Sequence, residues 1–422
     1  MPTRRKIDVG YLARVEGETA IEVRVPAPRG GETVRLRIFE PPRFFEGFLV
    51  GRRYDEVGDI VSRICGICPV SHMLTAIRAL ENAMGIEPSE QTRRLRLIET
   101  TSQVAASHLV HLYALVMPDH LSLAGFPEML PAHGEHVARL LRMREAVNDL
   151  TALVGGGRPL HPIGTVVGGF TRVPPAAELA GARERLIAIR PDARELVRTV
   201  ARFQTPQLER DREFVALRPA ERYSDNVGIV ASTAGLAVAE SEYRTAIGEE
   251  QVPYAMTKRA TLRGRGAMMV GALARMNLNA DRLSAPARDA AGEAGLALPD
   301  RNPFHNNLAQ AVEVVQAVED CIELLEGLSP RPERPAVQPA AGEGAAATEA
   351  PRGLLYHSYA VNRKGVVERA DIATPTVHNF LSMEEDLRAL VALLEDRPAA
   401  EIRLACEMLV RAYDPCFSCS VH

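Results

Sequence analysis

Two Cys-x-x-Cys pairs carry the clearest chemical signal in this chain. Cys65 and Cys68 lie in its first fifth, and Cys416 and Cys419 lie close to the end of the printed sequence, so four of the six cysteines belong to these pairs. Two thiolates separated by two residues can hold one metal ion. If the two pairs meet in space, four thiolates surround a single site.

Several kinds of site use such thiolates. A structural zinc site suits four thiolates, but zinc ribbons and fingers keep their pairs about 12 to 20 residues apart, whereas most of this chain separates the two pairs. An iron–sulfur cluster also favours four thiolates. A thioredoxin-like redox pair needs one Cys-x-x-Cys, and no compact strand–helix–strand pattern surrounds either pair. Spacing alone therefore leaves zinc, an iron–sulfur cluster and a catalytic transition metal open.

The residues beside the two pairs favour a catalytic metal. His72 follows Cys68 by four residues, so it is expected to hydrogen-bond a metal-bound thiolate. Asp414 and Pro415 stiffen the chain just before the second pair. His422 is expected to place its imidazole beside the metal.

The elements that must position these motifs are mostly helical. Residues 17–40 alternate apolar and polar side chains in two stretches, which predicts β-strands, and helical spacing begins near residue 55. Pro191 and Pro286 are expected to kink or interrupt their helices. The helices that the spacing predicts span 70–84, 89–117, 134–153, 176–203, 273–291, 304–328, 382–394 and 399–412.

This pattern predicts an α+β fold that is mainly α. We expect one large unit over residues 1–422, because its two ends must close one active site together. Within it, the sequence predicts a small β-rich part at 1–50, a large helical core at 51–328, an exposed Pro- and Ala-rich loop at 329–347, and a C-terminal part at 348–422 that completes the metal site.

Composition narrows the function. The net charge is −4 and Trp is absent, which argues against nucleic acid or an anionic membrane surface as a partner. No apolar run reaches the roughly 18 to 20 residues that a membrane span needs. Residues 1–6 are not followed by an apolar stretch, so no signal peptide is expected. No Gly-x-Gly-x-x-Gly fingerprint follows a strand, so a dinucleotide is expected to bind elsewhere.

The sequence around both cysteine pairs resembles the two signature motifs of the nickel–iron hydrogenase large subunit. These are Arg-Ile-Cys-Gly-Ile-Cys-Pro-Val-Ser-His at 63–72 and Asp-Pro-Cys-Phe-Ser-Cys-Ser-Val-His at 414–422. The resemblance is strongest to the soluble, cytosolic NAD(P)-linked branch, especially the NADP-reducing sulfhydrogenase alpha subunit, and the bidirectional NAD-linked type is the alternative. Further matching stretches follow in the family's order at 14–17, 42–46, 302–311, 349–353, 370–376 and 410–413.

The resemblance assigns the four cysteines. It implies that Cys65 and Cys416 are terminal nickel ligands, and that Cys68 and Cys419 bridge nickel to iron. Soft thiolates suit such a centre. The resemblance also implies one carbon monoxide and two cyanide ligands on the iron, and the reversible conversion of dihydrogen into protons and electrons.

The resemblance also assigns residues around the metals. Taken alone, Glu16 and Arg352 are ordinary loop charges, and Thr376 is a turn cap. By resemblance, Glu16 is the first proton relay, and Arg352, which follows Pro351, donates to one cyanide through its planar guanidinium while Thr376 donates to the other. A carboxyl group buried near a metal can pass protons near neutral pH.

One position departs from many relatives. They pair the arginine with an aspartate, but the aligned residue here is Ser107. We therefore assign Asp414 as the nearby carboxylate with a catalytic role. His108 is expected to lie just outside the metal ligands, and His111 to be a core histidine.

A second metal site is implied by the same resemblance. Glu46, the Ile372 carbonyl and His422 match a magnesium site, and hard oxygen ligands suit that ion. Cys321 and Cys406 match no motif, and Cys321 is expected to be a packed small residue.

Electrons need a route out of such a site. Only Cys321 and Cys406 remain for a further cluster, so we expect a small subunit with iron–sulfur clusters, and beyond it NAD(P)-binding flavin and further iron–sulfur subunits. The resemblance also implies a cytoplasmic location and nickel-insertion proteins as partners. It further implies a maturation protease that cuts members of the family after the motif histidine, so that His422 would end the mature form. Two competing functions are a relative of a respiratory complex I subunit, which usually lacks the cysteines, and a non-catalytic zinc protein.

Overall fold

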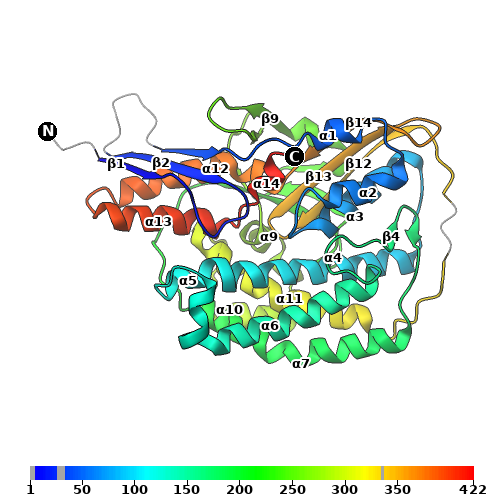
Figure 1. Cartoon of the computed structure of the whole chain (residues 1–422), viewed down its shortest axis with the longest axis horizontal. Helices are drawn as coiled ribbons and strands as arrows, with labels where there is room; N and C mark the ends of the chain where they lie inside the picture. The colour runs from blue at the N-terminus through cyan, green and yellow to red at the C-terminus, as the bar shows by residue number, and fades with distance from the viewer. Residues whose placement is uncertain (1–4, 26–33, 334–336) are drawn as a thin grey trace.

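The protein has a lower layer of long helices and an upper layer in which small sheets lie among further helices (Figure 1). This computed structural model describes residues 5–25, 34–333 and 337–422. The fold is α+β and mainly helical, which confirms the predicted class. The longer helices are α2 (Tyr54–Ser62), α3 (Pro69–Met84), α4 (Glu90–Val110), α6 (Met129–Val154), α7 (Ala176–Val200), α9 (Ala272–Asn279), α10 (Ala285–Glu293), α11 (Asn306–Leu325), α12 (Pro375–Leu393) and α13 (Ala399–Ala412).

Short helices connect these elements. A π-helix, η1, continues α4 before α5 begins, and α14 lies inside the second cysteine motif. The short helices are α1 (Phe45–Leu49), η1 (His111–Val116), α5 (Met117–His120), η2 (Phe126–Glu128), η3 (Glu240–Glu242), α8 (Tyr243–Ala246), η4 (Ala280–Arg282), η5 (Pro303–His305) and α14 (Phe417–Ser420).

The strands form several small sheets, nearly all antiparallel. One sheet has the order β1-β2-β3, another has β12-β13-β14, and a third has β11-β6-β7-β8 with β11 parallel to β6. The pairs β9-β10 and β4-β5 are separate. The strands are β1 (Arg5–Val9), β2 (Thr19–Val25), β3 (Val34–Ile38), β4 (Thr165–Val166), β5 (Gly169–Phe170), β6 (Glu213–Pro219), β7 (Gly228–Ser232), β8 (Ala237–Ala239), β9 (Ile247–Gln251), β10 (Lys258–Leu262), β11 (Met268–Met269), β12 (Gly342–Ala350), β13 (Gly353–Val361) and β14 (Val367–Ala373).

The lower layer is a bundle in which α4 packs on α6 and α11, and α7 packs on the same two helices. The Ser89 hydroxyl accepts a hydrogen bond from the Thr92 N–H at 3.0 Å and so caps the start of α4. Pro191 does not break α7, because packing on both neighbours offsets the one lost hydrogen bond. Pro286 lies in the first turn of α10, so the predicted helix over 273–291 is indeed two helices.

The prediction of a purely helical core at 51–328 left out several strands. Strands β4 to β11 lie inside it, between residues 165 and 269. These strands were not predicted because they are short, and because β6 carries a continuous apolar run at 214–217 that is buried along its whole length. Such a run lacks the alternation that identifies a half-buried strand.

The predicted exposed loop at 329–347 was also wrong in its last part. Residues 342–347 belong to β12, which pairs with β13 and packs directly on α3. A side chain at Gly342 or Gly344 would collide with the backbone of Ala83 in α3. The Gly- and Ala-rich composition therefore reflects close helix–strand packing rather than a flexible linker.

The helix predicted over 382–394 starts earlier. It begins at Pro375, which occupies the first turn of α12, and Ser382 lies buried inside the helix. Proline is favoured in this position because its missing N–H would have no helical partner there. The early start matters because it brings Thr376 next to the second cysteine motif.

Within the described residues, none of the helices combines the length and the apolar character that crossing a bilayer requires.

Candidate metal centre

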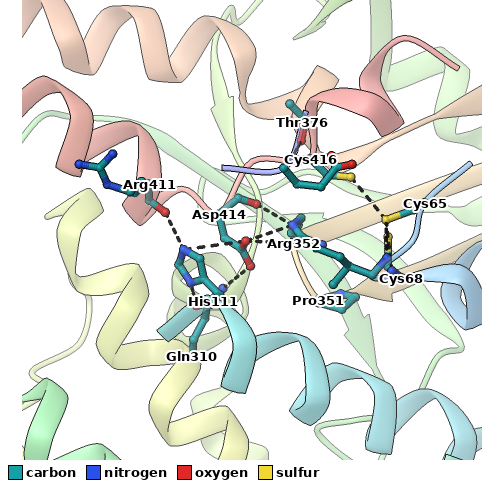
Figure 2. A network of polar contacts seen from close by, with 12 residues as sticks. Cys65, Cys68, His111, Gln310, Pro351, Arg352, Thr376, Arg411, Asp414 and Cys416 are labelled. Atoms are coloured by element: carbon teal, nitrogen blue, oxygen red, sulfur yellow. Dashed lines mark hydrogen bonds and ion pairs between the residues drawn. The ribbon is translucent and has the colours of Figure 1, made fainter. Parts of the chain in front are cut away.

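The four motif cysteines converge on one buried site. Cys68 immediately precedes α3, and Cys416 and Cys419 frame α14. Their ligand atoms all lie within 4.8 Å of one another, and all four residues are buried. The Cys65 and Cys416 sulfurs are 3.5 Å apart (Figure 2). Those of Cys68 and Cys419 are 4.0 Å apart. Cys416 and Cys419 are joined as a disulfide, and its reduction frees two thiolates, which together with Cys65 and Cys68 make four available to a metal.

Two chain segments far apart in sequence build this site. The Phe417 N–H donates to the Glu16 carbonyl at 3.0 Å, and Glu16 and Cys416 form a parallel β-bridge. Arg43 holds the other side, because its guanidinium donates to the carbonyls of Ile64, at 2.7 Å, and Ser418. One arginine thus ties the first cysteine motif to the second. The family motif at 42–46 contains Arg43, but nothing in the sequence alone indicated this role for it.

The pKa values of the two cysteines of the first motif shift in opposite directions. Burial raises the pKa of the Cys65 thiol, but the hydrogen bond with Cys68 and the charge of Arg352 outweigh burial and lower it. The bond to Cys65 and burial hold the pKa of Cys68 well above its ordinary value.

Arg352 lies in the turn between β12 and β13, and its side chain reaches between Asp414 and the cysteine sulfurs (Figure 2). Its Nε donates to the Asp414 carbonyl at 2.9 Å and to Oδ1 of that carboxylate at 3.1 Å. Burial alone lowers the pKa of Arg352, but Asp414, Cys68 and Cys65 outweigh burial and raise it. Its Nη1 is buried and has no partner among the described residues. A buried donor of this kind calls for an acceptor, and an anionic ligand on a metal held by the cysteines fits that need.

Asp414 supplies the carboxylate that Ser107 cannot. Its side chain is 1% exposed, accepts from Gln310 Nε2 at 3.0 Å, and has a left-handed backbone with φ of 50°. His111 Nε2 lies 3.8 Å from the Asp414 carboxylate and 2.7 Å from the Arg411 carbonyl. The Ser107 hydroxyl is buried without a partner among the described residues. The arginine–carboxylate pair therefore exists here, with its acid on the second cysteine motif.

Glu16 is hydrogen-bonded to the second cysteine motif. Its carboxylate accepts from the Ser418 N–H at 3.2 Å and from the Ser418 hydroxyl. That hydroxyl is 3.9 Å from the Cys416 sulfur. Ser418 was missed in the sequence analysis, although a hydroxyl residue inside a buried cysteine pair is a usable signal. Gly17 has φ of 85°, and a side chain there would collide with Ser418 and Glu40.

Thr376 and Pro351 also lie at the site. The Thr376 Oγ1 accepts from the Cys416 N–H at 2.8 Å, and its hydroxyl hydrogen remains available for donation. The Pro351 carbonyl accepts from Arg275 Nη2 at 3.0 Å, which fixes the segment just before Arg352.

The two histidines expected close to the metals bond elsewhere. His72 Nδ1 lies 3.2 Å from His357 Nε2, and the hydrogen bond between His72 and a metal-bound thiolate stays a prediction. His108 Nε2 lies 2.8 Å from Glu313. Burial lowers the pKa of His72 to about 3 and, despite Glu313, also lowers that of His108. Both rings support the site from behind as neutral groups.

Glu46, Ile372 and His422 also come together. The Glu46 carboxylate accepts from the Ile372 N–H at 2.9 Å and lies 3.9 Å from His422 Nε2, which bonds the Ile372 carbonyl at 2.9 Å. Burial raises the pKa of Glu46, but His422, Ile372 and the Lys258 ammonium lower it to about 2. An ionised carboxylate, a carbonyl oxygen and an imidazole fit a hard cation.

Fold and site together define a class of protein in which four buried cysteines, two from each end of the chain, can hold a metal. The sequence profile of the nickel-dependent hydrogenases matches residues 43–139 and 305–422. The chain is 34% identical over 421 residues to the sulfhydrogenase 1 subunit alpha of Pyrococcus furiosus, covering 99% of this chain and 97% of that one. It is 32% identical to the sulfhydrogenase 2 subunit alpha of the same organism, covering 99% and 98%.

A solved structure agrees with these relatives. The fold matches that of an NAD+-reducing [NiFe]-hydrogenase in the H2-reduced state, with a TM-score of 0.86, 26% identity and 99% of each chain covered. This chain belongs to the nickel-dependent hydrogenases and is their large, catalytic subunit.

Proposed function

We propose that this hydrogenase subunit converts dihydrogen reversibly into protons and electrons at a nickel–iron centre held by Cys65, Cys68, Cys416 and Cys419. The observation that carries the proposal is the convergence of four buried sulfurs next to the unpaired Arg352 Nη1. When bound, the two metals and the carbon monoxide and cyanide ligands of the iron supply the heterolytic cleavage of dihydrogen. Soft thiolates are the appropriate protein ligands for this chemistry.

The protein's own side chains transfer the proton and hydrogen-bond the diatomic ligands. The Ser418 hydroxyl lies between the Cys416 sulfur and the Glu16 carboxylate, so Glu16 receives the proton through Ser418. Asp414 holds the Arg352 guanidinium in place, so Arg352 Nη1 would be able to donate to one cyanide ligand. The Thr376 hydroxyl would be able to donate to the other.

Metal content tests this proposal directly. We expect about one nickel and one site iron per chain, with infrared bands from carbonyl and cyanide ligands. Cys65→Ser should lose the nickel, because a hydroxyl is a poor substitute for a thiolate. Cys321→Ser is the matched control: that cysteine is equally buried but lies in α11, outside the site, and its variant should keep both metals. Stoichiometric zinc without the infrared bands would contradict the proposal.

We further propose that Glu46, the Ile372 carbonyl and His422 hold magnesium. The ion would join the α1 segment and β14 to the second cysteine motif, and it would replace the hydrogen bonds that now connect these groups. Residues 1–422 would then act as one unit around both metal sites.

Electrons leave, in this proposal, through an iron–sulfur small subunit to further iron–sulfur and flavin subunits that reduce NADP. The support is that two relatives are named as alpha subunits of sulfhydrogenases, and that Cys321 and Cys406 are buried in different helices, α11 and α13. NAD is the alternative acceptor, favoured by the match to an NAD+-reducing hydrogenase. A cytoplasmic location, nickel-insertion proteins and a maturation protease complete the proposal.

The acceptor is open to a simple measurement. The purified complex should contain iron–sulfur and flavin subunits and should reduce NADP with dihydrogen as the donor. The isolated chain, even with its metals, should not reduce NAD or NADP, because no cluster or flavin connects its site to the nucleotide. Reduction by the isolated chain would overturn the partner argument, whereas a complex that reduces NAD but not NADP would move the acceptor to the alternative.

A further inference from the structure

Asp119 joins α5 to two other segments, the one that precedes Glu16 and the one that precedes Asp414. Its carboxylate accepts from Arg411 Nε at 2.6 Å and from Arg411 Nη2 at 2.9 Å, and it also accepts from Arg14 Nη2. The side chains of Asp119 and Arg411 are 2% and 1% exposed. One buried carboxylate therefore holds two guanidinium groups from opposite ends of the chain.

Each arginine fastens a segment that carries a site residue. Arg14 lies two residues before Glu16, and its Nη1 donates to the Leu115 carbonyl at 2.7 Å. Arg411 lies three residues before Asp414, and its Nη1 donates to the Ala13 carbonyl at 3.0 Å. The segments that carry the relay carboxylate and the partner of the active-site arginine are thus fixed to α5 and to each other.

The backbone at these positions needs such support. Arg14 has φ of 60° and Asp414 has φ of 50°, a left-handed conformation that costs energy for residues other than glycine. Such conformations persist where surrounding contacts enforce them. Figure 2 shows the Arg411 carbonyl bonded to His111 while its guanidinium points away from the thiolates. Arg411 is therefore held at both ends, by η1 through His111 and by α5 through Asp119.

We propose that Asp119 is a positioning residue for the hydrogenase reaction, which sets the places of Glu16 and Asp414 through Arg14 and Arg411. This inference rests on the proposed function, because it gives Glu16 and Asp414 their roles there. Removing the charge of Asp119 would leave two guanidinium groups without their shared buried partner, and both segments would relax.

The test is Asp119→Asn in the assembled complex. We expect the metals to remain, the infrared bands of the metal ligands to shift as Asp414 and Arg352 move, and turnover to fall about fivefold. Backbone amide exchange followed by mass spectrometry should rise in residues 12–18 and 411–419. The matched control is Asp192→Asn, since Asp192 also binds two arginines, Arg139 and Arg142, but away from the site. That control should change none of these readouts.

A second variant separates the contact with Arg14 from the contact with Arg411. It also covers the case in which the Asp119→Asn complex does not assemble. Arg14→Gln releases only the segment before Glu16, so turnover and amide exchange at residues 12–18 should change while the infrared bands stay in place. Unshifted bands and wild-type amide exchange in Asp119→Asn would overturn the inference, as would equal effects in Asp192→Asn. A wild-type complex without bands or hydrogen turnover would instead refute the proposed function, so the two failures are distinguishable.

Discussion

Glu16→Gln is expected to slow hydrogen–deuterium exchange and dihydrogen turnover at least about 100-fold, the lower range of losses for a positioned acid–base group. Glutamine keeps the shape of the side chain and can still accept from the Ser418 N–H, so the metals should remain. An amide cannot take up and release a proton at neutral pH, so the path from Cys416 through Ser418 would end there. Isotope exchange by mass spectrometry measures the loss, together with metal content.

The matched control is Glu18→Gln. Glu18 is an exposed carboxylate two residues further along the same loop, and its change should leave the exchange rate within about twofold of wild type, the range expected for a surface substitution. Wild-type exchange in Glu16→Gln would show that protons leave by another route.

Arg352→Lys is expected to lower turnover by at least about tenfold, or roughly 1.4 kcal/mol of transition-state stabilisation. Lysine keeps the positive charge but lacks the planar fork that binds Asp414 through Nε and Nη2 while presenting Nη1. The metals should stay bound, because the four thiolates are unchanged. Steady-state turnover and infrared band positions check the result.

Two controls bracket this prediction. Arg96→Lys alters another buried arginine, which binds Glu81 in two places at 2.7 and 2.8 Å but does not contact the thiolate site, so turnover should hardly change once the protein is folded. Ser107→Ala should also cost little, because this hydroxyl has no partner among the described residues. Equal losses in Arg352→Lys and Ser107→Ala would remove the role given to Arg352.

Local signals were sufficient for much of the helical scaffold. Pro69 and Gly85 bracket α3 as a helix start and a left-handed stop, and Ser89 caps α4. Local signals failed where a residue type is required by packing against a distant part of the chain. Gly342 and Gly344 have a linker-like composition, yet they are small because α3 lies against them. No property of residues 342–347 themselves reveals the helix that covers them.

The candidate site shows the same division. The cysteine motifs predicted that four sulfurs meet at one site, as they do in the structure, and the resemblance predicted that Arg352 and Glu16 lie beside them, because those patterns are local in sequence. The pairing of Arg352 with Asp414 and of His72 with His357 joins residues far apart in the chain. Asp414 was expected as a nearby carboxylate, but its bond to Arg352 and the contact between His72 and His357 depend on how α3, β12, β13 and α13 pack, so these contacts follow only from the folded structure.

The segment at 416–421 has a consequence for the lifetime of the bound metals. Every residue in it is buried, and its backbone is bonded to Glu16, Arg43, Thr257 and Thr376. A metal held behind these bonds can escape only when the segment opens, and such openings are rare events whose frequency follows local stability. Metal loss to a chelator should therefore reach a rate that no longer depends on chelator concentration, since the protein's own opening sets the pace.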